Sequence, residues 1–234
     1  MRLRLIAGLV LAPLLSAGAQ VGFLPSQSPY REIEHGSFFE LNGGRVYGGG
    51  GVVGLGPRSG TSEGFQFALR AKNTLQFSFG IWTAGTQRTL IDPRDSVARQ
   101  VKGLIPQRLN AAEFGIQFNL TGGKTWHLFA PYAGVGLGFV HGQASPASDT
   151  SSYAFGTKFF FAPALGTRFF LGQRAYLRVD LRALVWNLGY PVLYSTEPAK
   201  QPGTATLSNA VIKNGATSQY TLTPQLRIGI GFVP

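Results

Sequence analysis

The sequence predicts an all-β fold, an eight-stranded, antiparallel, up-and-down transmembrane β-barrel. The clearest of its strands covers residues 174–186, where apolar and mostly polar side chains alternate. A period of two residues is typical of a β-strand, because successive side chains point to opposite faces of the sheet. The apolar set is Leu177, Val179, Leu181, Ala183 and Val185, and it alternates with Tyr176, Arg178, Asp180, Arg182, Leu184 and Trp186.

The same alternation recurs along most of the chain, and no segment with helical periodicity could cover the apolar faces. No segment after the amino terminus reaches about 18 uninterrupted apolar residues, which excludes a helical membrane protein. The apolar faces therefore indicate contact with lipid. The 32 glycines and 18 phenylalanines agree with a transmembrane barrel.

The amino terminus has the features of a secretory signal peptide. Arg2 and Arg4 precede an apolar run, and Ala17-Gly18-Ala19 is a small-residue cleavage site. We predict a signal peptide over residues 1–19, an irregular periplasmic leader over 20–35 and an outer-membrane barrel over 36–234. The chain has no cysteine, so it forms no disulfide and carries no lipidated cysteine.

The positive charge of the chain is spread along its whole length. Cleavage after residue 19 removes two of the 21 Lys and Arg residues, which leaves 19 of them against 10 Asp and Glu, a net charge of +9. No Lys/Arg block typical of nucleic-acid binding is present, so we expect no nucleic-acid partner. Anionic solutes or the phosphates of lipopolysaccharide fit an exported basic protein better.

Turn residues divide the chain into eight predicted strands. In bacterial outer-membrane barrels the strand number is even, and short turns lie on the periplasmic side. The expected strands are residues 37–53, 64–71, 74–83, 108–120, 126–140, 153–171, 174–186 and about 220–232. The connections alternate between long ones (55–63, 84–106, 141–152, 189–219) and short ones (72–73, 121–124, 172–173).

Two features leave the pattern open. A soluble lipocalin-like barrel would show the same alternation with its faces inverted, and the sequence does not reveal which face points inward. Pro131 and Pro163 also lie inside predicted strands, where each removes a ladder donor. A bulge, a register shift or a strand that begins at the proline would accommodate them.

The segment Pro131-Tyr132-Ala133-Gly134-Val135-Gly136-Leu137-Gly138-Phe139, with the Arg-Ile-Gly-Ile-Gly-Phe close of the chain (227–232), resembles small outer-membrane barrels of the OmpA, OmpX and OmpW-like superfamily. The resemblance covers most of the mature sequence and implies an architecture rather than an activity. The carboxy-terminal aromatic that the barrel-insertion machinery reads in that family matches Phe232. Here Val233 and Pro234 follow it, which departs from the family pattern.

Charged residues on the polar faces of the strands form a candidate site. At eight strands side chains nearly fill a barrel, so the first interpretation is a salt-bridge network that fills the lumen. The alternative is a narrow, weakly anion-selective solute pore in which the excess of arginine sets the selectivity. The predicted lumen network is Glu113, Arg168, Arg178, Asp180, Arg182 and Arg227.

Catalysis and metal binding have little support in the sequence. The histidines are His35, His127 and His141, and Ser145, Ser148 and Asp149 near His141 look like ordinary loop residues. A nucleophile needs a base within reach and a group that orients it. We therefore predict no enzyme, no cofactor and no metal, and rank a lipid-modifying barrel enzyme third.

Aromatic residues near the predicted strand ends suggest a girdle at the membrane interfaces. The predicted girdle is Trp82, Trp126, Tyr153, Trp186, Tyr190 and Tyr194. Together these features predict an outer-membrane protein with a structural or surface-interaction role through its long loops. Its expected partners are outer-membrane lipid, lipopolysaccharide and the barrel-insertion machinery, and we expect a monomer.

Overall fold

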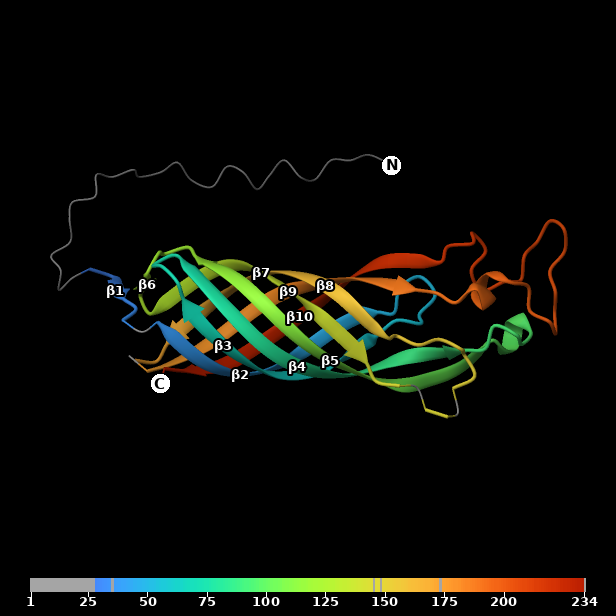
Figure 1. Cartoon of the computed structure of the whole chain (residues 1–234), viewed down its shortest axis with the longest axis horizontal. Helices are drawn as coiled ribbons and strands as arrows, with labels where there is room; N and C mark the ends of the chain where they lie inside the picture. The colour runs from blue at the N-terminus through green and yellow to red at the C-terminus, as the bar shows by residue number, and fades with distance from the viewer. Residues whose placement is uncertain (1–27, 35, 145, 148, 173, 234) are drawn as a thin grey trace.

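A computed structural model describes residues 28–34, 36–144, 146–147, 149–172 and 174–233. Eight long strands form a closed antiparallel barrel, in which each strand pairs with the next one along the chain and β10 pairs with β2 (Figure 1). This confirms the predicted fold. The predicted signal peptide (1–19) and the first part of the predicted leader (20–27) lie outside the described residues. The long strands are β2 (Ser37–Gly49), β3 (Arg58–Arg70), β4 (Leu75–Ile91), β5 (Val101–Asn119), β7 (Phe129–Gly142), β8 (Thr157–Phe170), β9 (Ala175–Gly189) and β10 (Ser218–Phe232).

The barrel has two unlike ends. Short turns, together with the end of β10, lie at one of them, which we call the turn end. The opposite, loop end carries the longer connections, including the short 3-10 helices η1 (Val97–Arg99) and η2 (Val192–Ser195) (Figure 1). No helix among the described residues is long and apolar enough to cross a membrane.

The predicted long connection at residues 84–106 is mostly strand. The ladder between β4 and β5 continues from Gly85↔Arg108 to Leu90↔Gly103, so the two strands form an extended hairpin beyond the barrel wall. The prediction failed because the polar side chains Thr86 and Arg88 resemble those of a loop, whereas both are buried among the loops of this end. The predicted connection at residues 55–63 is also mostly strand, because β3 begins at Arg58 and pairs with β2 in this stretch. Elsewhere the predicted strand ends differ from the observed ones by four residues or fewer.

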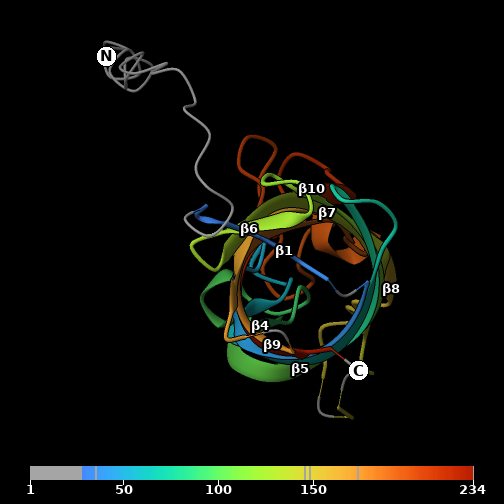
Figure 2. The same cartoon turned by 90° about the vertical axis from the view of Figure 1, so that its left-hand side faces the viewer.

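The predicted leader is not irregular throughout. β1 (Tyr30–Glu32) pairs with β6 (Lys124–Trp126), a short strand in the connection that precedes β7. β1 lies across the turn end of the ring of strands (Figure 2). Pairing to β6 satisfies backbone groups that a free leader would leave to solvent.

The two prolines have different surroundings. Pro131 is paired within a continuous β7–β8 register. At Pro163 the β8–β9 ladder is interrupted, and it resumes at Ala164↔Arg182 in the same register. The missing N–H donor of Pro163 therefore leaves a local gap in the β8–β9 ladder. Neither the predicted bulge nor a register shift occurs at either proline.

The outer wall of the barrel is apolar. Leu177, Val179 and Leu181 are 37%, 44% and 59% exposed, whereas Arg178 between them is buried. This facing excludes the inverted, lipocalin-like arrangement. On β8 the outward apolar residues run from Phe159 to Phe169. At a rise of roughly 3.3 Å per residue and a tilt of about 40°, they form a belt about 25 Å tall.

The interior is filled at three levels. Near the turn end, Phe38, Ala68, Ala130, Phe170 and Tyr176 form a small apolar cluster. The middle level holds the buried charges. A larger apolar cluster occupies the loop end, and it includes Val46, Leu55, Trp82, Leu109, Val140, Phe160, Leu184, Trp186 and Leu188.

Candidate functional site

The middle level of the lumen contains all six residues of the predicted charge network, and Glu40 of β2 joins them. Arg178 forms ion pairs with Glu40 at 3.1 Å and with Asp180 at 2.6 Å. Asp180 also accepts hydrogen bonds from Arg227, at 3.1 Å from Nε and 2.9 Å from Nη2. Tyr132 accepts from Arg178 Nε at 2.6 Å and donates to Asp180 at 3.2 Å. The carboxylate of Asp180 therefore links two guanidinium groups and a phenol.

A second ion pair lies nearer the loop end. Arg182 binds Glu113 through two parallel contacts, at 2.9 Å from Nη1 and 2.5 Å from Nη2. Trp82 Nε1 donates to the same carboxylate at 3.2 Å. A two-contact guanidinium–carboxylate pair fixes the orientation of both groups, so this pair holds β9 to β5 across the lumen.

Arg168 has no carboxylate partner among the described residues. Its guanidinium donates to the side-chain oxygen of Asn119 at 2.9 Å and to that of Gln117. The same group lies 4.6 Å from the centroid of the Tyr132 ring, a cation–π distance. With Glu40, Glu113 and Asp180 against four arginines, the buried network carries a formal charge of +1.

The loops above the barrel wall interlock into a head, which we define as residues 86–106, 149–156 and 190–217. The side chain of Arg88 is buried and forms an ion pair with Asp149. Tyr194 donates to the carbonyls of Ile91 at 3.1 Å and Ser151 at 2.8 Å, which ties three connections together. Burial raises the pKa of Tyr194 to about 12.

The tip of the head is fastened by a second cluster. Asp95 accepts from Lys200 at 3.1 Å and from Lys102, and these lysines belong to different segments. Their hydrogen bonds, led by that of Lys102, hold the pKa of Asp95 well below its usual range. Val97 N–H also donates to Gln201 at 3.1 Å. The β4–β5 hairpin is therefore attached to the loop that follows β9.

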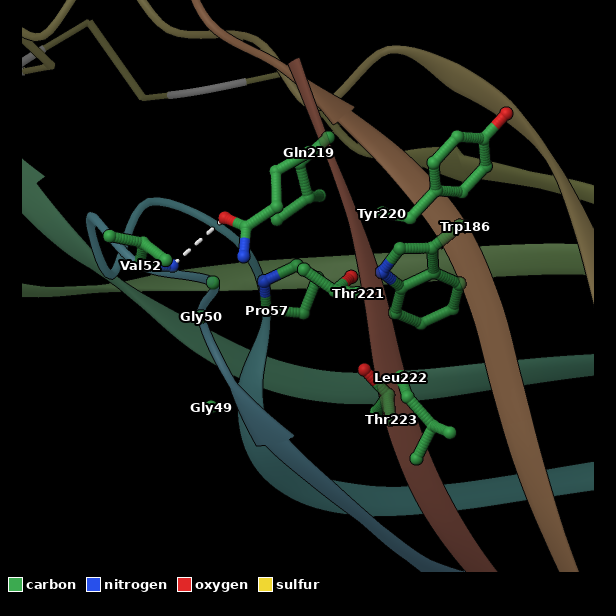
Figure 3. Close-up of a pocket in the computed structure, with 12 residues that line it drawn as sticks. Gly49, Gly50, Val52, Pro57, Trp186, Gln219, Tyr220, Thr221, Leu222 and Thr223 are labelled. Atoms are coloured by element: carbon green, nitrogen blue, oxygen red, sulfur yellow. Dashed lines mark hydrogen bonds between the residues drawn. The ribbon is translucent and has the colours of Figure 1, made fainter. Parts of the chain in front are cut away.

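A recess lies at the loop-end side of the seam between β2 and β10, beyond the end of their ladder at Gln225↔Val46. Gln219 lines it, and its Oε1 accepts from Val52 N–H at 3.0 Å (Figure 3). The same Oε1 also accepts from the Tyr190 hydroxyl at 2.9 Å. The volume of the recess is about 370 Å³, and Gly49, Gly50, Gly51, Val52, Pro57, Trp186, Leu188 and residues 219–223 line it.

Two solved structures have a similar architecture. The first is the outer membrane protein OprG from Pseudomonas aeruginosa, 14% identical, with 88% of this chain and 98% of that chain covered at a TM-score of 0.51. The second is Neisserial surface protein A, 13% identical over the same shares of the two chains, with a TM-score of 0.50. The fold is that of a small outer-membrane β-barrel. No protein-family model and no curated protein matches the sequence.

The predicted aromatic girdle of this barrel is wrong for five of its six residues. Trp126 is 49% exposed near the turn end, but the other five are buried. Trp82 and Trp186 are an even number of residues from the inward polar residues of their strands, so they point into the lumen although they lie near strand ends. Burial in the loop-end cluster or head also removes Tyr153, Tyr190 and Tyr194 from the girdle. Two outward aromatics near the loop-end edge, Tyr47 and Tyr220, were missed, although their parity matches the apolar belt.

The two histidines that the structure describes, His127 and His141, are not assembled into a catalytic group. His141 lies on the outer wall, where its Nδ1 is 2.9 Å from the hydroxyl of Thr157. Asp149 is directed to Arg88 and Ser151 rather than to a histidine. His35, Ser145 and Ser148 lie outside the described residues. Across the described ranges, no three His, Asp or Glu side chains come together as a metal site.

Proposed function

We propose that this chain is an outer-membrane protein whose barrel is closed to solutes and whose head contacts a partner outside the cell. The membrane placement is supported by the apolar belt, whose height of about 25 Å equals that of outer-membrane barrels. In this placement the turn end faces the periplasm and the head faces outward. The barrel is a monomer, and the insertion machinery reads the outward Phe232 near its carboxyl end.

The closed lumen is the observation that carries the proposal. Buried ion pairs occupy its middle level, and apolar clusters occupy the levels above and below. Ions would have to break charge-assisted hydrogen bonds to pass, and these are among the stronger contacts in a protein. The arrangement favours a structural scaffold over the alternative of an anion-selective pore.

Planar-bilayer recording tests the closed lumen. We expect no discrete conductance steps from the purified barrel. A quadruple variant, Glu40→Ala, Glu113→Ala, Arg178→Ala and Arg182→Ala, removes both partners of two buried ion pairs and serves as a conducting control. Discrete steps from the unaltered protein that reverse toward the anion potential would reject a purely structural barrel.

The head favours an acidic partner, such as a charged surface glycan. The head holds six Lys and Arg residues against four Asp and Glu residues, and its exposed side chains include Arg94, Arg99 and Lys213, which form no ion pair among the described residues. Opposite charge accelerates association and is weakened by salt. We expect the barrel in nanodiscs to bind dextran sulfate and not neutral dextran. The double variant Arg94→Gln/Arg99→Gln should bind several-fold more weakly, and equal binding of both polymers would contradict the proposal.

A further inference from the structure

A groove runs along the outer wall of the barrel over β3, β4 and β5, at the loop-end edge of the apolar belt. Its apolar part encloses about 780 Å³ beside the outward side chains of Phe65, Ile81 and Phe139. These three lie in one cross-strand row with Ala112, whose small side chain leaves the space between its larger neighbours open. The register therefore places an apolar hollow in the wall at the level of lipid acyl chains.

The next row toward the head is polar. Glu63, Thr83 and Asn110 face one another across β3, β4 and β5, and His141 continues the row on β7. All four point outward, because each lies two residues from an outward apolar side chain of its own strand. Together they donate and accept hydrogen bonds, so this level of the wall fits the hydroxyl groups of a sugar.

Beyond the polar row the groove continues into a notch of about 440 Å³, which Glu63, Thr83 and Arg108 help to line. Glu63 and Thr83 also line the apolar part, so the two parts are continuous. Gly85 lies beside Arg108 in the β4–β5 ladder, and a Cβ there would meet nothing within 4 Å, which leaves the notch open. The groove therefore changes from apolar to polar at the edge of the belt, where acyl chains give way to headgroups.

Two opposite charges lie on the two sides of this notch. Glu63 on β3 and Arg108 on β5 are exposed, and neither forms an ion pair with another described residue. Arg108 Nε donates to the Thr83 hydroxyl at 3.3 Å, which holds the guanidinium over β4. The nearby Arg45 lies 5.9 Å from the centroid of the Tyr47 ring, on the side away from Glu63.

The spacing of the two charges fits a small dipolar headgroup. Two strand spacings of about 4.8 Å and two residues of about 3.3 Å separate the Cα atoms of Glu63 and Arg108, roughly 12 Å in all. Both side chains extend outward from the wall and shorten this gap. A headgroup that carries an ammonium and a phosphate a few bonds apart can therefore contact both.

We propose that this groove binds an outer-leaflet glycolipid that carries phosphoethanolamine, with its ammonium at Glu63, a phosphate at Arg108 and an acyl chain in the apolar part. A lipid with phosphate alone would bring a second negative charge close to Glu63, whereas the dipolar headgroup satisfies both side chains. The polar row selects a sugar over a glycerol headgroup. The inference rests on the proposed membrane placement with the head outside, and it does not depend on whether the lumen conducts.

Native mass spectrometry of the barrel in detergent tests the site with three probes: lipid A that carries phosphoethanolamine, bis-phosphorylated lipid A, and phosphatidylethanolamine. The unaltered protein should bind the first about fivefold more tightly than the second, as expected for one additional exposed ion pair. Glu63→Gln should remove this preference, because the amide carries no charge. Arg108→Gln should weaken the binding of both lipid A forms, since both carry a phosphate.

Two further variants complete the test. Glu34→Gln, at an exposed carboxylate of the turn end, is the matched control and should keep the preference. Ala112→Phe fills the apolar part without changing a charge and should weaken the binding of both lipid A forms. A heat-dependent shift in electrophoretic mobility verifies that each variant is folded.

The proposal is overturned by equal binding of the two lipid A forms to the unaltered protein. A preference that persists in Glu63→Gln, or unchanged binding in Arg108→Gln, overturns it as well. Equally tight binding of phosphatidylethanolamine overturns the glycolipid assignment. Failure of this site would leave the absence of conductance intact, so the two proposals fail separately.

Discussion

Replacement of Asp180 by asparagine tests the role of the lumen network most directly. The carboxylate of Asp180 receives hydrogen bonds from Arg178, from two nitrogens of Arg227 and from Tyr132, at 2.6 to 3.2 Å. Asparagine keeps the shape but removes the negative charge. The formal charge of the buried network then rises from +1 to +2, and Arg227 loses its ion-pair partner.

The expected loss of stability is large. Removal of one partner from a buried ion pair costs about 3–5 kcal/mol, because the remaining charge stays buried without compensation. With a denaturant dependence of roughly 2 kcal/mol per molar urea, the unfolding midpoint should fall by about 2 M. Urea titration of the barrel in lipid vesicles, followed by tryptophan fluorescence, measures this shift.

Two comparisons make the result interpretable. Glu63→Gln removes a carboxylate from the exposed outer surface and should change stability by less than about 0.5 kcal/mol. The double variant Asp180→Asn/Arg227→Met removes both partners and should recover part of the loss. If Asp180→Asn unfolds within about 0.5 kcal/mol of the unaltered protein, the network does not stabilise the barrel and the reasoning fails.

Three further predictions concern the head, the turn end and the facing of the tryptophans. Hydrogen bonds from two lysines depress the folded-state pKa of Asp95. The stabilisation that Asp95 gives is therefore present above the ordinary carboxyl pKa of about 4 and is lost as the pH falls below that value. Hydrogen exchange at the head tip should accelerate below this pH, and an Asp95→Asn variant should lack the pH dependence. A Cβ at Gly231 would lie 2.0 Å from the Tyr176 ring, so Gly231→Val should destabilise the barrel by about 3 kcal/mol, seen as a lowered midpoint of the heat-dependent mobility shift. In brominated lipid, the tryptophan fluorescence of a variant that retains only Trp126 should be quenched, whereas that of a variant that retains only Trp186 should not. The opposite result would contradict the facing of both tryptophans.

The two-residue period carried most of what could be predicted. With the turn residues it predicted eight strands, and it placed Arg178, Asp180 and Arg182 on the face opposite the apolar set, because successive side chains in a strand point to opposite faces. It did not show which face is inward, and it did not show that residues 58–63 and much of 84–106 continue the strands. Where parity was set aside the prediction failed. Trp186 lies an even number of positions from Leu184 and Arg182, so it shares their face of β9. That parity contradicts its place in the predicted girdle.

Contacts between distant segments could not be read from the pattern. Glu40 lies in a glycine-rich strand of ambiguous facing, and its partner Arg178 comes from β9, far along the chain. The register that closes β10 onto β2 brings the two together. The attachment of Arg88 to Asp149 likewise depends on how three connections fold over one another, which no local periodicity encodes.

The pairing of Glu40 with Arg178 has a consequence for biogenesis. One partner belongs to the first strand of the closed wall and the other to the last hairpin, so Glu40 gains its counter-charge only when the cylinder shuts, whereas Arg178 also has Asp180 on its own strand. An open, partly assembled sheet in a bilayer would leave the carboxylate of Glu40 facing hydrocarbon, which is costly. Neutralisation of the buried charge, closure of the barrel and entry into the bilayer are therefore coupled. An insertion factor that shields the open strand edges until the last hairpin arrives would meet this requirement.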